Sequence, residues 1–522
     1  MTSRSRLLAA TAALAVTGIA LAGCSGGGGS SSKGGSDDDK LVVAVGTPPV
    51  SLDTLKAATG VPGTWFETPA YAGILTRDAD GKIQAGLAEK WEYVGDANTD
   101  FEFTLRDKLT FADGTPLDAK AAAASLDYFT KTTTGPSRAY FAPMTFTAKD
   151  DLTVHITSAV PNPIIPDLLT VGLLGGAPIS PAGIADESAR AGDTYGAGQY
   201  VLDPKKTVSG DHYVYVPNKK YWDQKAVTYS EIDVRVIPNA QQQVQALKSG
   251  EVDAIVGDPS IGGTVSGNGL EEIHQPSTVY NFYLMDRGGK VVPALANEKV
   301  RQALNFAVDR EAIAKAALGD YGKATDQTAL DAGEAAGYDP KLEKEYTYDP
   351  AKAKALLKEA GFADGFTLPA TYLGFSPTDS KIAQAVASQL AEVGVTMQLK
   401  SEPDFGTWVN DLVANTYGAT LLTGGGSQMY IDAQFAFTQN AVMNQFGVAN
   451  SDIDAAFQKL ASAAPDEIGS AAQGVSSVIV KQALSLPIAT SDSIIIYNSK
   501  KVKPYYLGST GELAPIESWP QK

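Results

Sequence analysis

Cysteine and histidine are scarce in this chain of 522 residues, which has one cysteine, Cys24, and three histidines. A single thiol cannot form a disulfide within the chain. His155, His212 and His274 stand far apart in the sequence and show no metal-ligand spacing. The composition therefore argues against a disulfide scaffold and a histidine-built metal site, and we expect no cofactor and no bound metal.

Motifs for phosphate, dinucleotide and acyl chemistry are also missing. The Gly-Lys pairs at 81–82, 289–290 and 322–323 are not followed by Ser or Thr, so no Walker-type loop is present. A Gly-rich stretch from Gly196 has Val201 where a dinucleotide fingerprint needs its third glycine. No Gly-x-Ser-x-Gly elbow occurs. These gaps predict a protein that is not an enzyme, although they leave open a glycosidase built on two distant acids.

Long apolar runs are confined to the first residues. Arg4 and Arg6 precede a mostly apolar stretch of about 16 residues, Leu7 to Ala22, which is short for a membrane span. This order is typical of a secretory signal, which we assign to residues 1–23. The following "LAGC" resembles the lipobox of bacterial lipoproteins. That resemblance implies that Cys24 carries a diacylglycerol, becomes the first residue of the mature chain and anchors it to a membrane.

A flexible tether follows the cysteine. Eleven of the twelve residues from Ser25 to Ser36 are Gly or Ser, a composition that behaves as random coil. Residues 24–40 would hold a folded body roughly 20–25 Å from its anchor. The net charge of −17 argues against nucleic acid and anionic lipid as partners.

From residue 41 the pattern is that of a mixed α/β protein. Phe101, Phe103 and Leu105 alternate as in a half-buried strand, and Asp118 can cap the helix that follows. Residues 365–373, 381–394 and 395–400 read as strand, helix and strand, which predicts a βαβ unit with a parallel pair. In residues 241–257, the sequence "QQQVQALKSGEVDAIVG" predicts a helix that ends at Gly250, followed by a buried strand.

Five ordered blocks between about Leu41 and Lys503 resemble family 5 extracellular solute-binding proteins, the oligopeptide, dipeptide and nickel-binding group that serves ABC importers. They are "GLAEKWEYVGDANTDFEFTLRDKLTFADGTPLDAKAAAASLDYF", "GAGQYVL", "NKKYWDQKAVTYSEIDVRVIPNAQQQVQALKSGEVDAIVG", "VRQALNFAVDREAI" and "DPAKAKALLKEAGF".

The resemblance implies an α/β, two-lobed periplasmic-binding-protein-like fold of class II, with a subdomain inserted in the first lobe. Hinge strands should fall near 279–286 and 485–492. We expect lobe I to comprise 41–60, 192–279 and 491–522, the insert 61–191, and lobe II 280–490.

The ligand would bind between the lobes. Tyr280, Asn281 and Tyr283 lie at the inferred crossover, and Trp65 stands in an irregular Gly/Pro-rich stretch. Trp408 lies on a predicted helix whose core face would be Phe405, Val409 and Leu412, so packing and ligand stacking are equal alternatives for it.

The segment after the strand that ends near residue 423 departs from the family. Peptide-binding relatives usually carry there an aspartate that pairs with the peptide's amino group, whereas this chain has Gly424, Gly425, Gly426 and Ser427. Nearby Tyr430 and Asp432 complete the candidate ligand-binding set. Asp432 would replace the missing acid from a shifted loop, or else the ligand lacks an amine, because a buried ammonium without a partner costs several kcal/mol.

The leading hypothesis is a monomeric, lipid-anchored extracytoplasmic receptor that binds a peptide or similar small solute and delivers it to an ABC permease. Alternatives of the same fold are a receptor for an oligosaccharide or a metal chelate, and a ligand-sensing lipoprotein. A surface hydrolase is the alternative from another class.

Overall fold

The computed structural model describes residues 39–57, 64–133, 138–173, 175–257, 259–263, 265, 267–374, 376–426, 428–508 and 510–522. Cys24, the signal segment and most of the tether lie outside these ranges, as does Ser427. No helix within them is long and apolar enough to span a membrane.

An 11-stranded mixed sheet runs through the described residues. Ten strands follow one another in space, and β13 (Gly322–Ala324) pairs with β17 off this path. The order is β15 (Val395–Glu402), β14 (Phe366–Leu373), β16 (Ala419–Gly424), β12 (Leu270–Leu284), β17 (Ser485–Asn498), β11 (Ala254–Gly257), β1 (Lys40–Val45), β10 (Glu231–Val236), β9 (His212–Pro217) and β8 (Tyr200–Leu202).

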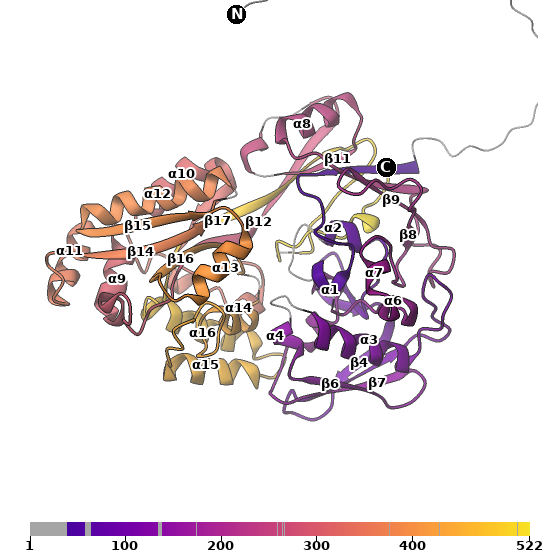
Figure 1. Ribbon diagram of the computed structural model, residues 1–522, viewed down its shortest axis with the longest axis horizontal. Helices are drawn as coiled ribbons and strands as arrows, with labels where there is room; N and C mark the ends of the chain where they lie inside the picture. The colour runs from indigo at the N-terminus through magenta and orange to yellow at the C-terminus, as the bar shows by residue number, and fades with distance from the viewer. Residues whose placement is uncertain are drawn as a thin grey trace, which may run out of the picture. The chain divides into compact units, whose positions relative to one another are not determined.

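The two long strands β12 and β17 connect the two halves of this sheet (Figure 1). They pair antiparallel from Leu270↔Asn498 to Tyr283↔Ser485. On one side of the sheet β17 also pairs with β11, and on the other side β12 also pairs with β16, both antiparallel. The register is irregular between Pro276 and Thr278 and again at Tyr280. The chain therefore crosses between the halves on a strand pair whose ladder is interrupted midway.

The first half of the sheet follows the predicted pattern. Strands β1 and β10 are parallel neighbours, and β1 also pairs with β11 in parallel. Helix α8 (Ala240–Ser249) begins at Asn239, whose side chain accepts a hydrogen bond from Gln242 N. It ends at Gly250, which has φ 77°, a left-handed conformation that glycine adopts without strain. The predicted helix and the buried strand after it are thus confirmed.

A separate antiparallel sheet has the order β4 (Ala88–Tyr93), β5 (Asp100–Leu105), β7 (Thr153–Ser158) and β6 (Met144–Ala148), with β2 (Leu75–Arg77) and β3 (Ile83–Ala85) as an additional hairpin. Phe101, Phe103 and Leu105 of β5 are fully buried, as their alternation predicted. Helix α3 (Ala119–Thr132) packs against β6 and β7 and is capped by Asp118. Short helices complete this region: α1 (Thr54–Ala57), α2 (Thr64–Glu67), α4 (Arg138–Phe141), α5 (Ile165–Leu168), α6 (Pro181–Ala185) and α7 (Glu187–Arg190).

The second half of the sheet carries most of the longer helices. Strands β14 and β15 are parallel and joined by α12 (Pro377–Glu392), which confirms the predicted βαβ unit. Asp309 and Asp349 precede α10 and α11 and each accept a hydrogen bond from the first turn of their helix. The other helices are α9 (Glu298–Phe306), α10 (Arg310–Leu318), α11 (Pro350–Glu359), α13 (Phe405–Val413), α14 (Met429–Ala436), α15 (Ser451–Ala461) and α16 (Ile468–Lys481).

A tyrosine from the second half of the sheet packs on one face of the crossing strands. Tyr321, just before β13, donates from Oη to Glu272 Oε1 of β12 at 2.7 Å. Its ring meets the His274 ring edge-on at 5.2 Å between centroids, and His274 Nδ1 lies 2.6 Å from Asp492 Oδ2 of β17. The ring also lies where a Cβ on Gly262 would stand. Tyr321 therefore fills a space that only glycine leaves open.

We expect Gly262→Ala to lower the free energy of unfolding by about 1–3 kcal/mol, because the added methyl group overlaps the Tyr321 ring. Urea denaturation followed by circular dichroism measures the change. Gly192→Ala is the matched control, since a Cβ there meets nothing within 4 Å. Equal stability of the two variants would show that the ring moves aside freely.

Candidate functional site

A cavity of about 800 Å³ lies between the crossing strands, the β2–β3 hairpin, the short helices α2 and α5, and segments of the C-terminal part of the chain. Its floor includes residues of the crossing strands, Ser277 and Thr278 of β12 and Ser493 of β17. Ser493 follows Asp492 directly, so the cavity and Tyr321 lie on opposite faces of the strand pair. The walls come from segments far apart in sequence: 64–68, 77–82, 167–172, 256–257, 332–335, 428–431 and 510–515.

An arginine with three polar neighbours forms one wall of the cavity. Arg77, at the end of β2, donates to Gly81 O at 2.8 Å and forms an ion pair with Asp167 of α5. Its Nε lies 3.5 Å from Glu512 Oε2 on the C-terminal segment. Only 14% of the Arg77 side chain is exposed, so its charge is held by two carboxylates in a partly desolvated place.

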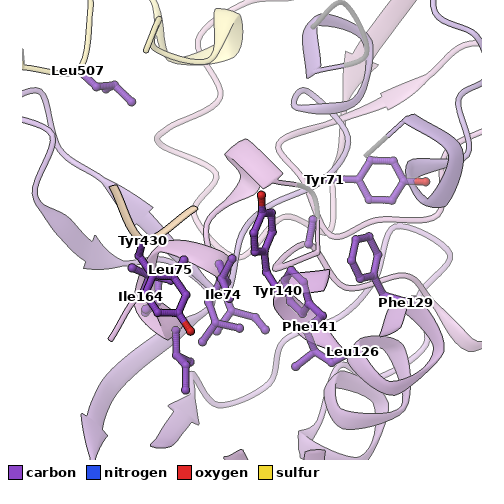
Figure 2. Packing of buried hydrophobic residues seen from close by; sticks show 14 of the residues in the cluster. Tyr71, Ile74, Leu75, Leu126, Phe129, Tyr140, Phe141, Ile164, Tyr430 and Leu507 are labelled. Atoms are coloured by element: carbon purple, nitrogen blue, oxygen red, sulfur yellow. The ribbon is translucent and has the colours of Figure 1, made fainter. Parts of the chain in front are cut away.

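Hydrogen bonds join the two sides of the cavity. Gln428, before α14, donates from Nε2 to Asp167 Oδ1 at 3.0 Å, and Tyr430 Oη donates to Pro161 O at 3.1 Å. Asn98 Nδ2 donates to Ala461 O and Ala463 O at the end of α15. Figure 2 shows Tyr430 beside Leu75 and Ile164, which belong to the other side. The structure thus has the walls of the cavity in direct contact.

Trp65 is the predicted candidate that lines the cavity. It lies in α2, a single helical turn, so the prediction of an irregular segment was wrong at this position. The ring is half-buried and meets Trp519 edge-on, with centroids 6.4 Å apart. Trp519 is fully buried and donates from Nε1 to Ala514 O at 2.8 Å. A fixed indole therefore holds Trp65 at the cavity wall.

Trp408 does not line the cavity. It is 2% exposed, and its Nε1 donates to Thr420 Oγ1 of β16 at 3.0 Å. Of the two interpretations left open by the sequence, the structure supports packing. Leu412 is buried beside it as predicted, but Phe405 is 52% exposed, so its assignment to the core face was wrong.

The three β12 candidates lie inside the sheet and are not among the cavity-lining residues. Tyr280, Asn281 and Tyr283 are 7%, 1% and 6% exposed. Tyr283 packs between Phe435 and Phe437, with ring centroids 6.1 and 6.3 Å away. In this structure they are packed within the protein, and a direct ligand contact for them remains a prediction.

The glycines after β16 make room for a carboxylate. Gly425 and Gly426 have φ 65° and 101°, and a Cβ on Gly425 would lie 2.7 Å from Asp432 Oδ1. Gly426 N donates to Asp432 Oδ2 at 2.7 Å. Gly424 ends β16, and a Cβ added there would meet nothing within 4 Å. The absence of side chains at Gly425 and Gly426 therefore leaves room for the Asp432 carboxylate. Ser427 lies outside the described residues.

Asp432 is a buried acid with an unusual protonation balance. Burial raises its pKa to about 7, although the hydrogen bond from Gly426 N lowers it. Burial of Tyr140 in α4 and of Tyr283 in β12 is the main cause of their raised pKa values, and the charge of Asp432 is the second cause. Asp432 is not itself among the residues that line the cavity, but Gln428 and Ile431 of the same segment are.

The histidines each contact an aspartate. His155 Nε2 lies 3.1 Å from Asp100, and His212 Nδ1 lies 2.6 Å from Asp211. In the part of the chain that the structure describes, no group of three or more His, Cys, Asp or Glu side chains is arranged to hold a metal ion.

The sequence analysis missed the polar residues of the cavity, among them the connected group Arg77, Asp167, Gln428 and Glu512. They are charged or amide residues in short elements and loops, separated by 84 to 261 positions along the chain, in a protein with 59 acids. No local pattern marks such residues as neighbours.

Comparisons with known proteins agree on one family. The family model of bacterial extracellular solute-binding proteins, family 5 (middle region) matches residues 82–445. The glutathione-binding protein GsiB of Salmonella paratyphi A is 29% identical over 366 residues, which cover 69% of each chain. GsiB of Escherichia coli K12 is also 29% identical over 368 residues and again covers 69% of each chain.

Solved structures of about the same size share the fold. The binding protein AgaA of A. tumefaciens R10, in complex with agropinic acid, aligns with a TM-score of 0.78 at 20% identity, covering 92% of this chain and 99% of that one. The ABC transporter substrate-binding protein CtaP of Listeria monocytogenes aligns at 0.75 and 24% identity, with the same coverage.

We expect Asp432→Asn to flatten the pH dependence of stability between about pH 4 and 7. In this window the folded protein keeps a proton on Asp432 (pKa about 7) that the unfolded chain, with a pKa of about 3.9, has released. The wild type therefore loses stability as the pH rises, by up to about 1.4 kcal/mol per pH unit from this group.

Urea denaturation at pH 4, 5, 6, 7 and 8 measures this effect as the difference between the two proteins. Glu517, whose pKa burial also raises to about 7, is present in both and cancels in the difference. Parallel stability profiles would mean that Asp432 is ionised throughout the range.

Proposed function

Since the chain belongs to the bacterial extracellular solute-binding proteins of family 5, as its sequence blocks predicted, we propose that it captures a small solute in the cavity and delivers it to the permease of an ABC importer. It acts by binding and release, with no chemical conversion of the solute. Its fold is the two-lobed α/β fold of periplasmic binding proteins.

The observation that carries this proposal is the cavity on the crossing strands, with walls that contact one another across it. A solute that touches both walls binds the closed arrangement better than an open one. Ligands shift such an equilibrium only by this difference in affinity. The site therefore suits a receptor that closes around a bound solute, so that its conformation differs between the free and the bound state.

We assign lobe I to residues 41–60, 192–279 and 491–522, the insert to 61–191 and lobe II to 280–490. On this division the cavity draws Arg77 and Asp167 from the insert, Glu512 from lobe I and Gln428 from lobe II. The hinge is then the interrupted stretch of β12 and β17 near Pro276 and Ser491.

A peptide or a peptide-like solute is the ligand class we propose. The named GsiB relatives bind glutathione, itself a modified tripeptide, and a tripeptide-sized molecule fits a cavity of about 800 Å³. Polar side chains such as Thr68, Ser277 and Thr510 line the cavity and can bond a peptide backbone.

We also propose that Cys24 carries the lipid that holds the receptor on the outer side of the cell membrane, with residues 24–40 as its tether. The lipobox-like "LAGC" and the Gly/Ser composition support this assignment. An anchored receptor stays close to its permease, which raises the rate at which the two meet.

The ligand class is tested by a thermal-shift screen of peptides, oligosaccharides and metal chelates, followed by calorimetric titration of each hit against Trp65→Ala. We expect peptides to stabilise the wild type. The variant should bind about tenfold or more weakly, because a fixed aromatic ring at the wall is lost.

Trp222→Ala is the control, since it removes an indole that is 42% exposed and stacked under Arg106 away from the cavity. Stabilisation by sugars alone, or equal affinity of the Trp65 and Trp222 variants, would contradict the proposed ligand or the proposed site respectively.

Cys24→Ser should release the protein from membranes into the medium, because the acyl chains are attached to the thiol and the remaining chain has no other proposed anchor. Immunoblots of membrane and medium fractions measure the distribution. A serine variant that stays in the membrane fraction would refute the lipid assignment while leaving the binding function intact.

A further inference from the structure

The turn between β4 and β5 contacts the end of helix α15 at a place outside the cavity. Asn98 in this turn donates from Nδ2 to Ala461 O at 3.2 Å and to Ala463 O at 2.9 Å. None of these three residues is among those that line the cavity. On the division proposed above, the contact joins the insert to lobe II, at a point that a solute in the cavity does not touch.

The backbone holds this turn without help from the Asn98 side chain. Asn98 has φ 53°, a left-handed conformation that asparagine adopts more readily than most residues. Its carbonyl oxygen accepts from Asn162 N at 2.8 Å, and Val94 N donates to Asp100 O at 2.9 Å across the turn. These are bonds between backbone atoms. The side-chain amide is therefore available for the contact with α15.

The two acceptors lie at the carboxyl end of a helix, where carbonyl groups lack partners within the helix and carry the negative end of its dipole. Ala461 is the last residue of α15. The residue four positions later, whose N–H would continue the helix, is Pro465, which has no N–H. Ala461, Ala463 and Asn98 are all buried. The Asn98 amide thus satisfies a buried carbonyl that the sequence of the helix end leaves open.

Tyr430 makes a second contact between the same two regions. Its Oη donates to Pro161 O at 3.1 Å, and Pro161 directly precedes the Asn162 that bonds to Asn98. Its ring packs on Phe457 of α15, with centroids 5.0 Å apart. The Tyr430 side chain is buried and is not in the cavity lining. In this structure the tyrosine therefore supports the contact of the insert with lobe II.

We propose that Asn98 and Tyr430 form a latch, which stabilises the closed arrangement of the receptor from outside the cavity. This inference rests on the proposed function, because it assumes that the receptor opens and closes around a solute. The two residues meet their acceptors only when the insert and lobe II meet, so the latch contributes to closure and makes no contact with the solute. Ligands shift the equilibrium by their own difference in affinity for the two states, and the latch sets the point from which they shift it.

The latch gives the insert a role in capture. It changes the closed-to-open ratio by one factor whatever the solute is, and it leaves the choice between solutes to the cavity. Asn98 is in this sense a positioning residue, because it acts on the arrangement of the walls.

Two substitutions at Asn98 test the latch. Asn98→Gly keeps the left-handed turn and removes the amide. Asn98→Asp keeps the shape of the side chain, but a carboxylate then faces two carbonyl oxygens at the negative end of α15. Asn440→Asp is the charge-matched control, because Asn440 is exposed and lies outside the cavity lining.

Single-molecule energy transfer measures the closed-to-open ratio, with dyes on Lys131→Cys in α3 and Glu359→Cys in α11, two exposed positions. Cys24→Ser removes the one native thiol. We expect Asn98→Gly to lower the ratio about tenfold and Asn98→Asp to lower it further, whereas Asn440→Asp keeps the wild-type ratio. The ratio is measured in the free receptor and with glutathione or Ala-Ala-Ala added, and the factor should be the same in each condition.

Melting curves check that the variants fold. Should the Asn98 variants not fold, Tyr430→Phe tests the contact from lobe II by removing Oη alone, and it should lower the ratio about threefold. An equal ratio in the wild type and in the folded latch variants overturns the latch while the receptor function stands. A wild type with no closed molecules, free or with either peptide, also overturns it. A lower ratio in the latch variants, with neither peptide bound by the wild type, supports the latch and shows that the proposed ligand class is wrong.

Discussion

The antiparallel pairing of β12 with β17 is the constraint on which the rest of the structure depends. These strands belong to both halves of the large sheet, so every element on one side is positioned relative to the other through them. Their backbone ladder is irregular between Pro276 and Thr278 and again between Tyr280 and Asn281, and regular on either side of this stretch. A ladder with a local irregularity keeps the halves in register and concentrates bending at one place. The cavity is lined by Ser277 and Thr278 of this irregular stretch, so a small rotation there displaces the cavity walls relative to each other.

The walls themselves combine charge and closure in one group of residues. Asp167 accepts from Arg77 on its own side and from Gln428 across the cavity. The electrostatics of the site and the contact between its walls therefore share an atom, Asp167 Oδ1. The ion pair of Arg77 and the hydrogen bond across the cavity are thus linked through one carboxylate, without any long-range relay.

Local features of the fold were predictable because their causes are local. The alternation of Phe101, Phe103 and Leu105 and the cap at Asp118 depend on neighbours within a few residues, and the structure has them as expected. Trp408 could not be assigned, because a tryptophan on an amphipathic helix suits both a core and a cleft until its partner Thr420 is known. The pairing of Arg77 with Asp167 and Glu512 depends on the fold bringing three remote segments together, which no pattern in one sequence encodes.

The packing of Tyr321 against Gly262 has a mechanical consequence. The ring and the cavity occupy opposite faces of the strand pair, so a rotation that widens the cavity drives the ring toward the glycine backbone. The space there is already filled. This contact, on the face of the strand pair opposite the cavity, therefore opposes any rotation that would widen the cavity.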